Sequence, residues 1–226
     1  MINFDSGEES YDGYLAVAKG GRGSGVIVIQ EWWGLVGHIK NVADRLAEAG
    51  FTALAPDLYK GKQAEEPDEA GKLMMALDID DAAEVLARAA QYLVEHDAVS
   101  SAQVGVVGFC MGGQLSLFAG SLSDHIGAVA DFYGIHPNVH PNYDEMSAPV
   151  LGIFAEHDDY ASPEAVRKLD QELTNHGVQH EFITYPGTHH AFLNDDRPQV
   201  YNAKAAADAW KRLLEFFQKN LAESKS

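Results

Sequence analysis

The sequence has a single cysteine among 226 residues, so it cannot form an internal disulfide. It also lacks a run of about 18 apolar residues of the kind that crosses a membrane. The first ten residues, MINFDSGEES, have neither a basic start nor an apolar segment. We therefore expect no secretory signal, no membrane partner and a reducing, cytoplasmic location.

Basic residues are scarce. Lysine and arginine together number 16 against 34 aspartates and glutamates, which gives a formal net charge of −18. Such a surface repels phosphate backbones, so we expect no nucleic-acid partner. The charge favours solubility.

No internal repeat, low-complexity tract or Pro/Ser-rich linker interrupts the chain. The hydrophobic fraction of 46% and the charged fraction of 22% are ordinary for a folded globular protein. A chain of this length can bury one substantial core. We expect one domain that spans residues 1–226.

Short β-branched apolar runs alternate with segments of helical periodicity. The expected strands cover residues 23–30, 51–59, 102–109, 127–134, 148–156 and 178–187. The expected helices cover 39–50, 78–97, 110–122, 162–177 and 206–217, with Ser162 as N-cap, Pro163 in the first helical position and Gly50 and Gly177 at C-termini. This alternation predicts the α/β class, with a mainly parallel sheet and helices on both faces.

The one cysteine, Cys110, stands in the stretch GFCMGG, directly after an expected buried strand. A lone thiol is commonly a small buried side chain. The G-x-C-x-G frame, however, is equivalent to the nucleophile elbow G-x-S-x-G, in which Gly108 and Gly112 permit a sharp turn between strand and helix. The helix N-terminus that follows favours a thiolate. The elbow interpretation requires catalytic partners elsewhere in the chain.

Such partners follow the last two expected strands. YPGTHHAF supplies His189 and His190, of which at most one can face a shared site, and we select His190 as the base. The stretch EHDDY offers Glu156, Asp158 and Asp159 as the acid that orients the imidazole. With Asp158 in that role, the order nucleophile, acid, histidine is that of α/β-hydrolases.

A further carboxylate, Glu31, is the first charged residue after the apolar run VIVIQ and should face the same site. The backbone amides of Trp32 and Met111 are candidate oxyanion donors. The side chains of Trp32 and Trp33 fit either a core position or a pocket wall.

The motifs QEWWG, PDLY, GFCMGG, EHDDY and HHAF, in this order, resemble the dienelactone hydrolase family over roughly Ser10 to Leu221. The resemblance implies an α/β-hydrolase fold without a large cap domain, a small ester or lactone substrate, and no metal or organic cofactor. We expect a monomer or small homo-oligomer. The resemblance also implies the roles of the site residues. Cys110 would be the nucleophile, Asp158 the orienting acid and His190 the base. Glu31 would be the carboxylate that meets the resting thiol, and Trp32 and Met111 would be the two oxyanion donors.

Two stretches depart from the family pattern. Family members that open lactones hold the substrate carboxylate with arginines after DLY and after the H-x-F histidine, where this chain reads DLYKGKQ and HAFLNDDR. Lys60, Lys62 and Arg197 are the candidate replacements, with Trp33 as a further substrate contact. A lysine lacks the bidentate fork of arginine, which weakens the case for dienelactone itself as substrate.

The expected function is a cysteine-dependent hydrolase of carboxylic esters or lactones that works through an acyl-thioester. One alternative is a thiol-based redox sensor or deglycase-like protein that uses Cys110 with Glu31. Another is a binding domain that retains only the fold. His136 and His140 lack a carboxylate or cysteine at ligand spacing, so we expect no metal site.

Overall fold

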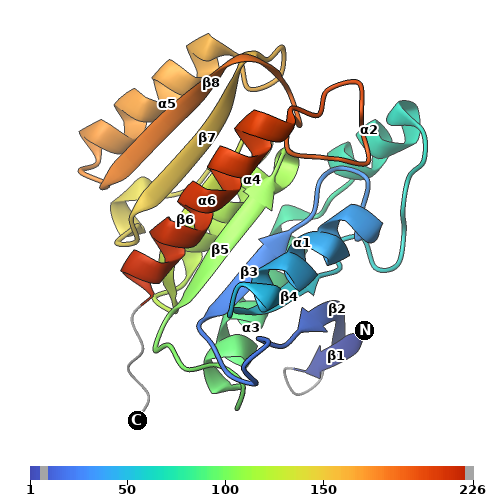
Figure 1. Cartoon of the computed structure of the whole chain (residues 1–226), viewed down its shortest axis with the longest axis vertical. Coiled ribbons are helices and arrows are strands. Elements are labelled where there is room, and N and C mark those ends of the chain that lie inside the picture. Colours follow the sequence, from blue (N-terminus) through green and yellow to red (C-terminus); the bar gives the residue numbers. More distant parts are fainter. Residues whose placement is uncertain (6–9, 222–226) are drawn as a thin grey trace.

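One sheet carries the fold. The computed structural model describes residues 1–5 and 10–221, and Figure 1 shows its elements. The strands are β1 (Ile2–Asp5), β2 (Ser10–Ala16), β3 (Gly25–Ile29), β4 (Thr52–Pro56), β5 (Val104–Phe109), β6 (Ile126–Phe132), β7 (Val150–His157) and β8 (His180–His189). The helices are α1 (Gly37–Glu48), α2 (Pro67–Met75), α3 (Ile79–Glu95), α4 (Met111–Leu122), α5 (Pro163–Asn175) and α6 (Ala203–Asn220), with a short 3₁₀ helix, η1 (Tyr143–Glu145).

The strand order in the sheet is β1-β2-β4-β3-β5-β6-β7-β8. Strands β3 to β8 run parallel, and β1 and β2 form an antiparallel edge. Every residue of β3, β4 and β5 is buried, as their continuous apolar sequences predict. The mainly parallel sheet is therefore confirmed. The β1 and β2 edge escaped the sequence analysis because both strands are short and partly polar.

Helices cover both faces of this sheet (Figure 1). α1 and α6 pack on one face in a core that includes Leu46, Leu213 and Phe217. α3, α4 and α5 pack on the other, in a core that includes Leu93 and Leu173. The confirmed layers explain the helical periodicities, because each apolar stripe is buried against the sheet.

Several helix ends follow from local chemistry. The Ser162 side chain accepts a hydrogen bond from an amide in the first turn of α5, and Pro163 takes the first helical position, as predicted. α2 was not predicted because only Ala70 is buried on it, so it has no apolar stripe. Its start is set by Pro67 and by acidic residues in the first turn.

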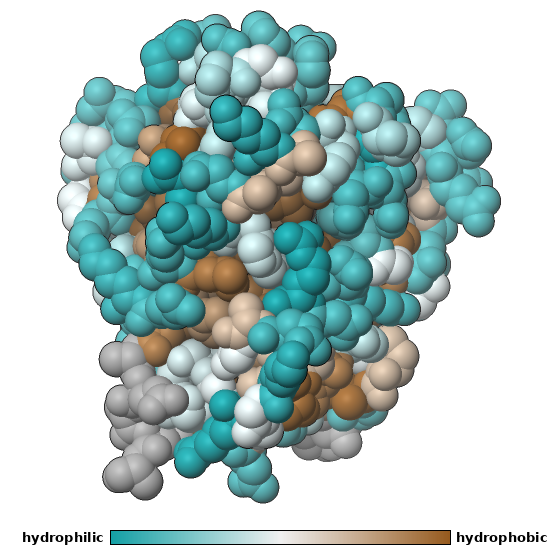
Figure 2. All heavy atoms as spheres, viewed as in Figure 1, coloured by the Kyte–Doolittle hydropathy of each residue, from teal (hydrophilic) through white to brown (hydrophobic). Residues whose placement is uncertain are grey.

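The face shown in Figure 2 is covered largely by hydrophilic residues, with hydrophobic residues visible in smaller patches. This agrees with the charge of −18. None of the helices within residues 1–5 and 10–221 is both long and apolar enough to span a membrane.

One buried charge-bearing group stands out in the sheet. Asp131, near the end of β6, is fully buried, and among the described residues neither carboxyl oxygen forms a hydrogen bond of regular geometry. One oxygen lies so close to Gly113 and Gly134 that a Cβ atom at either position would collide with it. Burial raises the pKa of Asp131 from 3.8 to about 7, and the Gly134 amide partly offsets that rise.

This shift predicts a pH-dependent stability. The folded state binds the Asp131 proton more tightly than the unfolded chain does. The contribution of this protonated carboxyl to the free energy of unfolding is therefore complete below about pH 4 and is lost as the pH rises to about 7. Asp131→Asn keeps the shape without the charge. At pH 8 it should raise the free energy of unfolding by a few kcal/mol relative to wild type, on the order of 4 at most.

Urea unfolding of both proteins at several pH values from about 4 to 8 measures the difference. The exposed Asp124, just before β6, offers a control, since Asp124→Asn should leave the stability difference near zero at every pH. A wild type and an Asp131→Asn variant whose stabilities stay parallel across the range would contradict the prediction.

Candidate active site

Five chain segments bring polar or reactive side chains to one edge of the sheet. Each lies directly after the carboxyl end of a parallel strand, namely β3, β5, β6, β7 and β8. In open α/β sheets, ligands bind at this edge. The side chains concerned are those of Glu31, Cys110, Tyr133, Asp158 and His190.

Cys110 occupies the turn between β5 and α4 with φ 56° and ψ −123°, a conformation that residues other than glycine rarely adopt. The turn is packed closely. A Cβ atom on Gly108 would overlap the Gly112 carbonyl, and one on Gly112 would overlap the Gln30 carbonyl on the β3 side. The thiol-bearing residue is 9% exposed. Met111 is the first residue of α4, so its backbone amide donates no hydrogen bond within the helix.

His190 follows β8 and forms a 2.8 Å hydrogen bond through Nδ1 to Asp158 Oδ2. The other Asp158 oxygen accepts the backbone amides of Tyr160 and Ala161 at 2.8 and 2.9 Å. The Asp158 side chain is completely buried, whereas that of His190 is 14% exposed. The aspartate therefore fixes the imidazole, while the neighbouring His189 is exposed.

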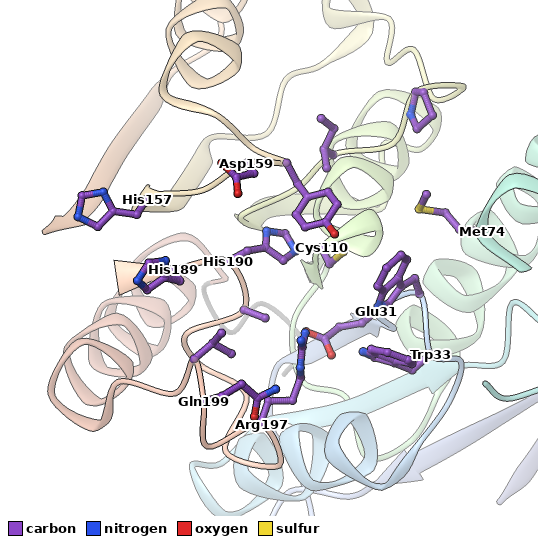
Figure 3. A pocket seen from close by; sticks show the side chains of 16 residues that line it. Glu31, Trp33, Met74, Cys110, His157, Asp159, His189, His190, Arg197 and Gln199 are labelled. Carbon is purple, nitrogen blue, oxygen red and sulfur yellow. The ribbon is translucent and has the colours of Figure 1, made fainter. Parts of the chain in front are cut away.

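The other side of the His190 ring faces Cys110 (Figure 3). Burial by itself lowers the pKa of His190, but hydrogen bonds with Asp158 and Cys110, and the charges of both, raise it to about 10. An imidazole held in this way keeps its proton at neutral pH and can stabilise a thiolate beside it.

Glu31 is 1% exposed and lies in the turn after β3. Its Oε2 accepts a 2.8 Å hydrogen bond from Asn194 Nδ2, while its Oε1 is buried and has no partner among the described residues. The Asn194 Oδ1 atom accepts the Asp196 amide, so the asparagine side chain is fixed at both ends. The structure thus gives Glu31 a hydrogen-bond partner in Asn194 and leaves its other oxygen without one among the described residues.

Tyr133 follows β6 and also has a positive φ, 43°. Its ring contacts His190 with centroids 5.1 Å apart, and its hydroxyl is buried. Burial, followed by the charges of Glu31 and Cys110, raises the Tyr133 pKa well above its usual range. The hydroxyl therefore stays protonated beside the site.

A cavity of about 560 Å³ opens beside Glu31, Cys110 and His190. Figure 3 shows the side chains that line it: Glu31, Trp32, Trp33, Met74, Cys110, Ile135, Pro137, His157, Asp159, Tyr160, His189, His190, Ala191, Arg197, Gln199 and Val200. Its volume lies in the range that accommodates small organic ligands.

The structure separates the four substrate contacts expected from the sequence. Arg197 and Trp33 both line the cavity, with the guanidinium carbon 5.7 Å from the indole centroid. Lys60 and Lys62 are not among the lining residues. Lys60 instead pairs with Asp81 at 2.9 Å on the surface, and Lys62 is exposed.

No group of three or more histidine, cysteine, aspartate or glutamate side chains within the described ranges could hold a metal ion. Of the two histidines considered from the sequence, His136 is buried and bonds to backbone groups, its Nδ1 to the Asn138 amide and its Nε2 to the Met74 carbonyl. His140 is exposed.

Several site residues escaped the sequence analysis, among them Tyr133, Asn194 and Met74. Tyr133 could have been found, because DFYG ends an expected strand at the same edge as the other motifs. Asn194 and Met74 carry no sequence signal: the first acts through a contact 163 residues distant, and the second lies on the unpredicted α2.

Comparison with known proteins identifies the family of this chain. The model of the dienelactone hydrolase family matches residues 11–221. "Protein usf" of Aquifex pyrophilus is 39% identical over 228 residues, which cover 98% of both chains. A "Putative carboxymethylenebutenolidase" of Aquifex aeolicus is 34% identical over 225 residues, covering 96% of this chain and 97% of the relative.

The fold has matches among solved structures. A dienelactone hydrolase-like promiscuous phosphotriesterase from metagenomic libraries superposes with a TM-score of 0.87 at 22% identity, covering 98% of this chain and 97% of the other. That likeness concerns the fold, whereas the family match concerns the sequence. The chain therefore belongs to the dienelactone hydrolase family and is a hydrolase with the α/β-hydrolase fold.

Proposed function

We propose that this protein hydrolyses carboxylic esters or lactones through an acyl-thioester on Cys110. The observation that carries the proposal is the chain of contacts from Asp158 through His190 to Cys110 at the carboxyl edge of the sheet. A nucleophile, a base that reaches it, and a buried acid that orients the base form the arrangement that acyl transfer requires.

In the first half-reaction, the Cys110 sulfur attacks the carbonyl carbon of the substrate. The negative charge that develops on the carbonyl oxygen is stabilised by the amides of Trp32 and Met111. The bond between carbon and the leaving oxygen then breaks, and His190 gives its Nε2 proton to that oxygen. An alcohol, or the opened hydroxyl end of a lactone, is released.

In the second half-reaction, His190 removes a proton from water as the water oxygen attacks the thioester. The carbon–sulfur bond breaks, the carboxylic acid is released and the thiolate returns. Throughout, Asp158 holds the imidazole in the tautomer whose Nε2 faces the reacting atoms.

Glu31 contributes a second proton acceptor in this proposal. Glu31 lines the same cavity as Cys110, and its Oε1 has no partner among the described residues, so in this proposal it accepts a thiol proton whenever the cysteine is neutral. Asn194 is an uncharged hydrogen-bond donor, so it adds no positive charge that would neutralise the negative charge of the Glu31 carboxylate.

The Asp158–His190 pair favours a hydrolase over a thiol-based redox sensor. A cysteine that cycles through sulfenic acid needs an accessible thiolate but no general base fixed by a buried acid. Here the acid is fully buried and bonded on both oxygens, which orients the imidazole for proton transfer.

Cys110→Ala should remove the nucleophile and reduce hydrolysis of p-nitrophenyl acetate to near the background rate. The variant should keep the circular dichroism spectrum of the wild type, because alanine is small and the turn is held by its glycines. Unchanged turnover in a folded Cys110→Ala protein would end the proposal.

Asp158→Asn tests the acid with a matched control. The exchange should lower kcat by about 10² to 10⁴, because an amide favours the wrong imidazole tautomer. Another aspartate–histidine pair, the exposed Asp170 with His180 at 3.1 Å, lies outside the cavity lining. Asp170→Asn should leave kcat within about twofold of wild type. Equal effects of the two exchanges would show that Asp158 has no special role.

Alkylation kinetics test the pairing of Cys110 with His190. Because the His190 pKa is raised to about 10, the imidazole stays charged at neutral pH and stabilises a thiolate. The rate of modification by iodoacetamide at pH 7, followed by mass spectrometry, should therefore be at least about tenfold higher in wild type than in His190→Ala. Equal rates in the two proteins would contradict the pairing.

A further inference from the structure

The cavity has two chemically different ends. In Figure 3, His157 and His189 lie beyond His190 as seen from Cys110, whereas Met74 lies on the opposite side of Cys110. The histidine end is polar. The Met74 end is apolar and is lined by Trp32, Met74, Ile135 and Pro137. Trp32 lies close to Gly71 of α2, and the bond between His136 and the Met74 carbonyl brings Ile135 and Pro137 to the same helix.

The apolar end is a fixed structure because a buried histidine joins its walls. His136, which is 3% exposed, lies between Ile135 and Pro137 in the chain. Its Nδ1 accepts the Asn138 amide, so Nε2 carries the proton and donates to the Met74 carbonyl at 3.2 Å. Burial lowers the His136 pKa, which keeps the ring neutral. α2 is thereby held against the β6 loop.

Reaction geometry decides which part of a substrate each end receives. His190 protonates the leaving oxygen, so the leaving group must lie on the His190 side of Cys110, toward His157 and His189. The acyl group extends from the attacked carbon in the other direction, toward Met74. This assignment rests on the proposed function.

The charged side chains around the cavity restrict the chemistry of the acyl group further. Arg197 is the one lysine or arginine among the residues that line the cavity, and its guanidinium stacks on Trp33. The four side chains of the apolar end carry no charge. A carboxylate placed among them would lose its hydration without gaining a charged partner.

We propose that the acyl group of the substrate is uncharged and apolar, an alkyl chain or an aryl ring, and that Met74 limits its length. Methionine is flexible and fills irregular space, so one pocket of this kind accepts acyl groups of several shapes. The protein is then a hydrolase for apolar carboxylic esters, with selectivity set by a helix outside the catalytic motifs.

A series of p-nitrophenyl esters with one leaving group and acyl chains from acetyl to octanoyl tests the inference. Each methylene that is buried should raise kcat/KM about three- to fourfold until the pocket is full. The hexanoyl to acetyl ratio should therefore be at least about tenfold in wild type. The p-nitrophenyl monoester of succinic acid, which ends in a carboxylate, should be at least about tenfold poorer than the neutral ester of similar length.

Two variants on the same helix locate the effect. Met74→Trp should fill the apolar end and bring the hexanoyl to acetyl ratio to about one. Met75→Trp changes the neighbouring residue, which is 52% exposed and outside the cavity lining, and should keep the wild-type ratio. Met74→Ala provides a second test if the bulky variant does not fold, because it should move the preferred acyl length upward.

The outcomes separate this inference from the proposed function. A wild type that prefers the succinate ester, or a Met74→Trp variant with the wild-type ratio, would overturn the assignment of the apolar end while leaving Cys110 chemistry intact. Absence of any ester turnover that depends on Cys110 would overturn the proposed function and the inference with it.

Discussion

The close approach of three backbone segments at the turn after β5 is the constraint on which the site depends. The turn leaves room for hydrogen atoms alone at Gly108 and Gly112, since each faces a carbonyl of a neighbouring segment. Strand β3, the turn and helix α4 are therefore locked together. This packing holds Cys110 at its positive φ and brings Glu31 and the helix N-terminus to the same point.

Hydrogen bonds over long sequence distances then complete the site. Asp158 reaches His190 across 32 residues and Glu31 reaches Asn194 across 163. Both carboxylates are buried, but they are held differently. Asp158 is bonded on both oxygens and acts as a fixed support, whereas Glu31 is bonded on one oxygen and keeps the other available.

The sequence predicts the elements whose signals are local. Buried strands such as β5 have continuous apolar runs, and Ser162 and Pro163 mark the start of α5 through their own chemistry. Elements without a buried stripe, α2 above all, give no periodic signal. The ordering of motifs along the chain was enough to select Cys110 and His190 as candidates, because parallel strands bring their carboxyl ends to one edge.

Contacts between distant segments could not be predicted in the same way. Lysines after DLY were reasonable substrate contacts by position, yet Lys60 pairs with Asp81 on the surface. Nothing in the local sequence of Asn194 indicates that it binds Glu31, and nothing near Met74 indicates that its helix borders the cavity. Such partners are set by the packing of whole elements, which a single sequence does not record.

The aromatic side chains of the cavity have a practical consequence. The chain has three tryptophans, and two of them, Trp32 and Trp33, line the cavity with their rings 5.2 Å apart. The third, Trp210, is stacked beneath Arg45 on the face of the sheet covered by α1 and α6. Two of the three indole fluorophores of this chain therefore line the cavity, so binding of a ligand there should change the tryptophan emission.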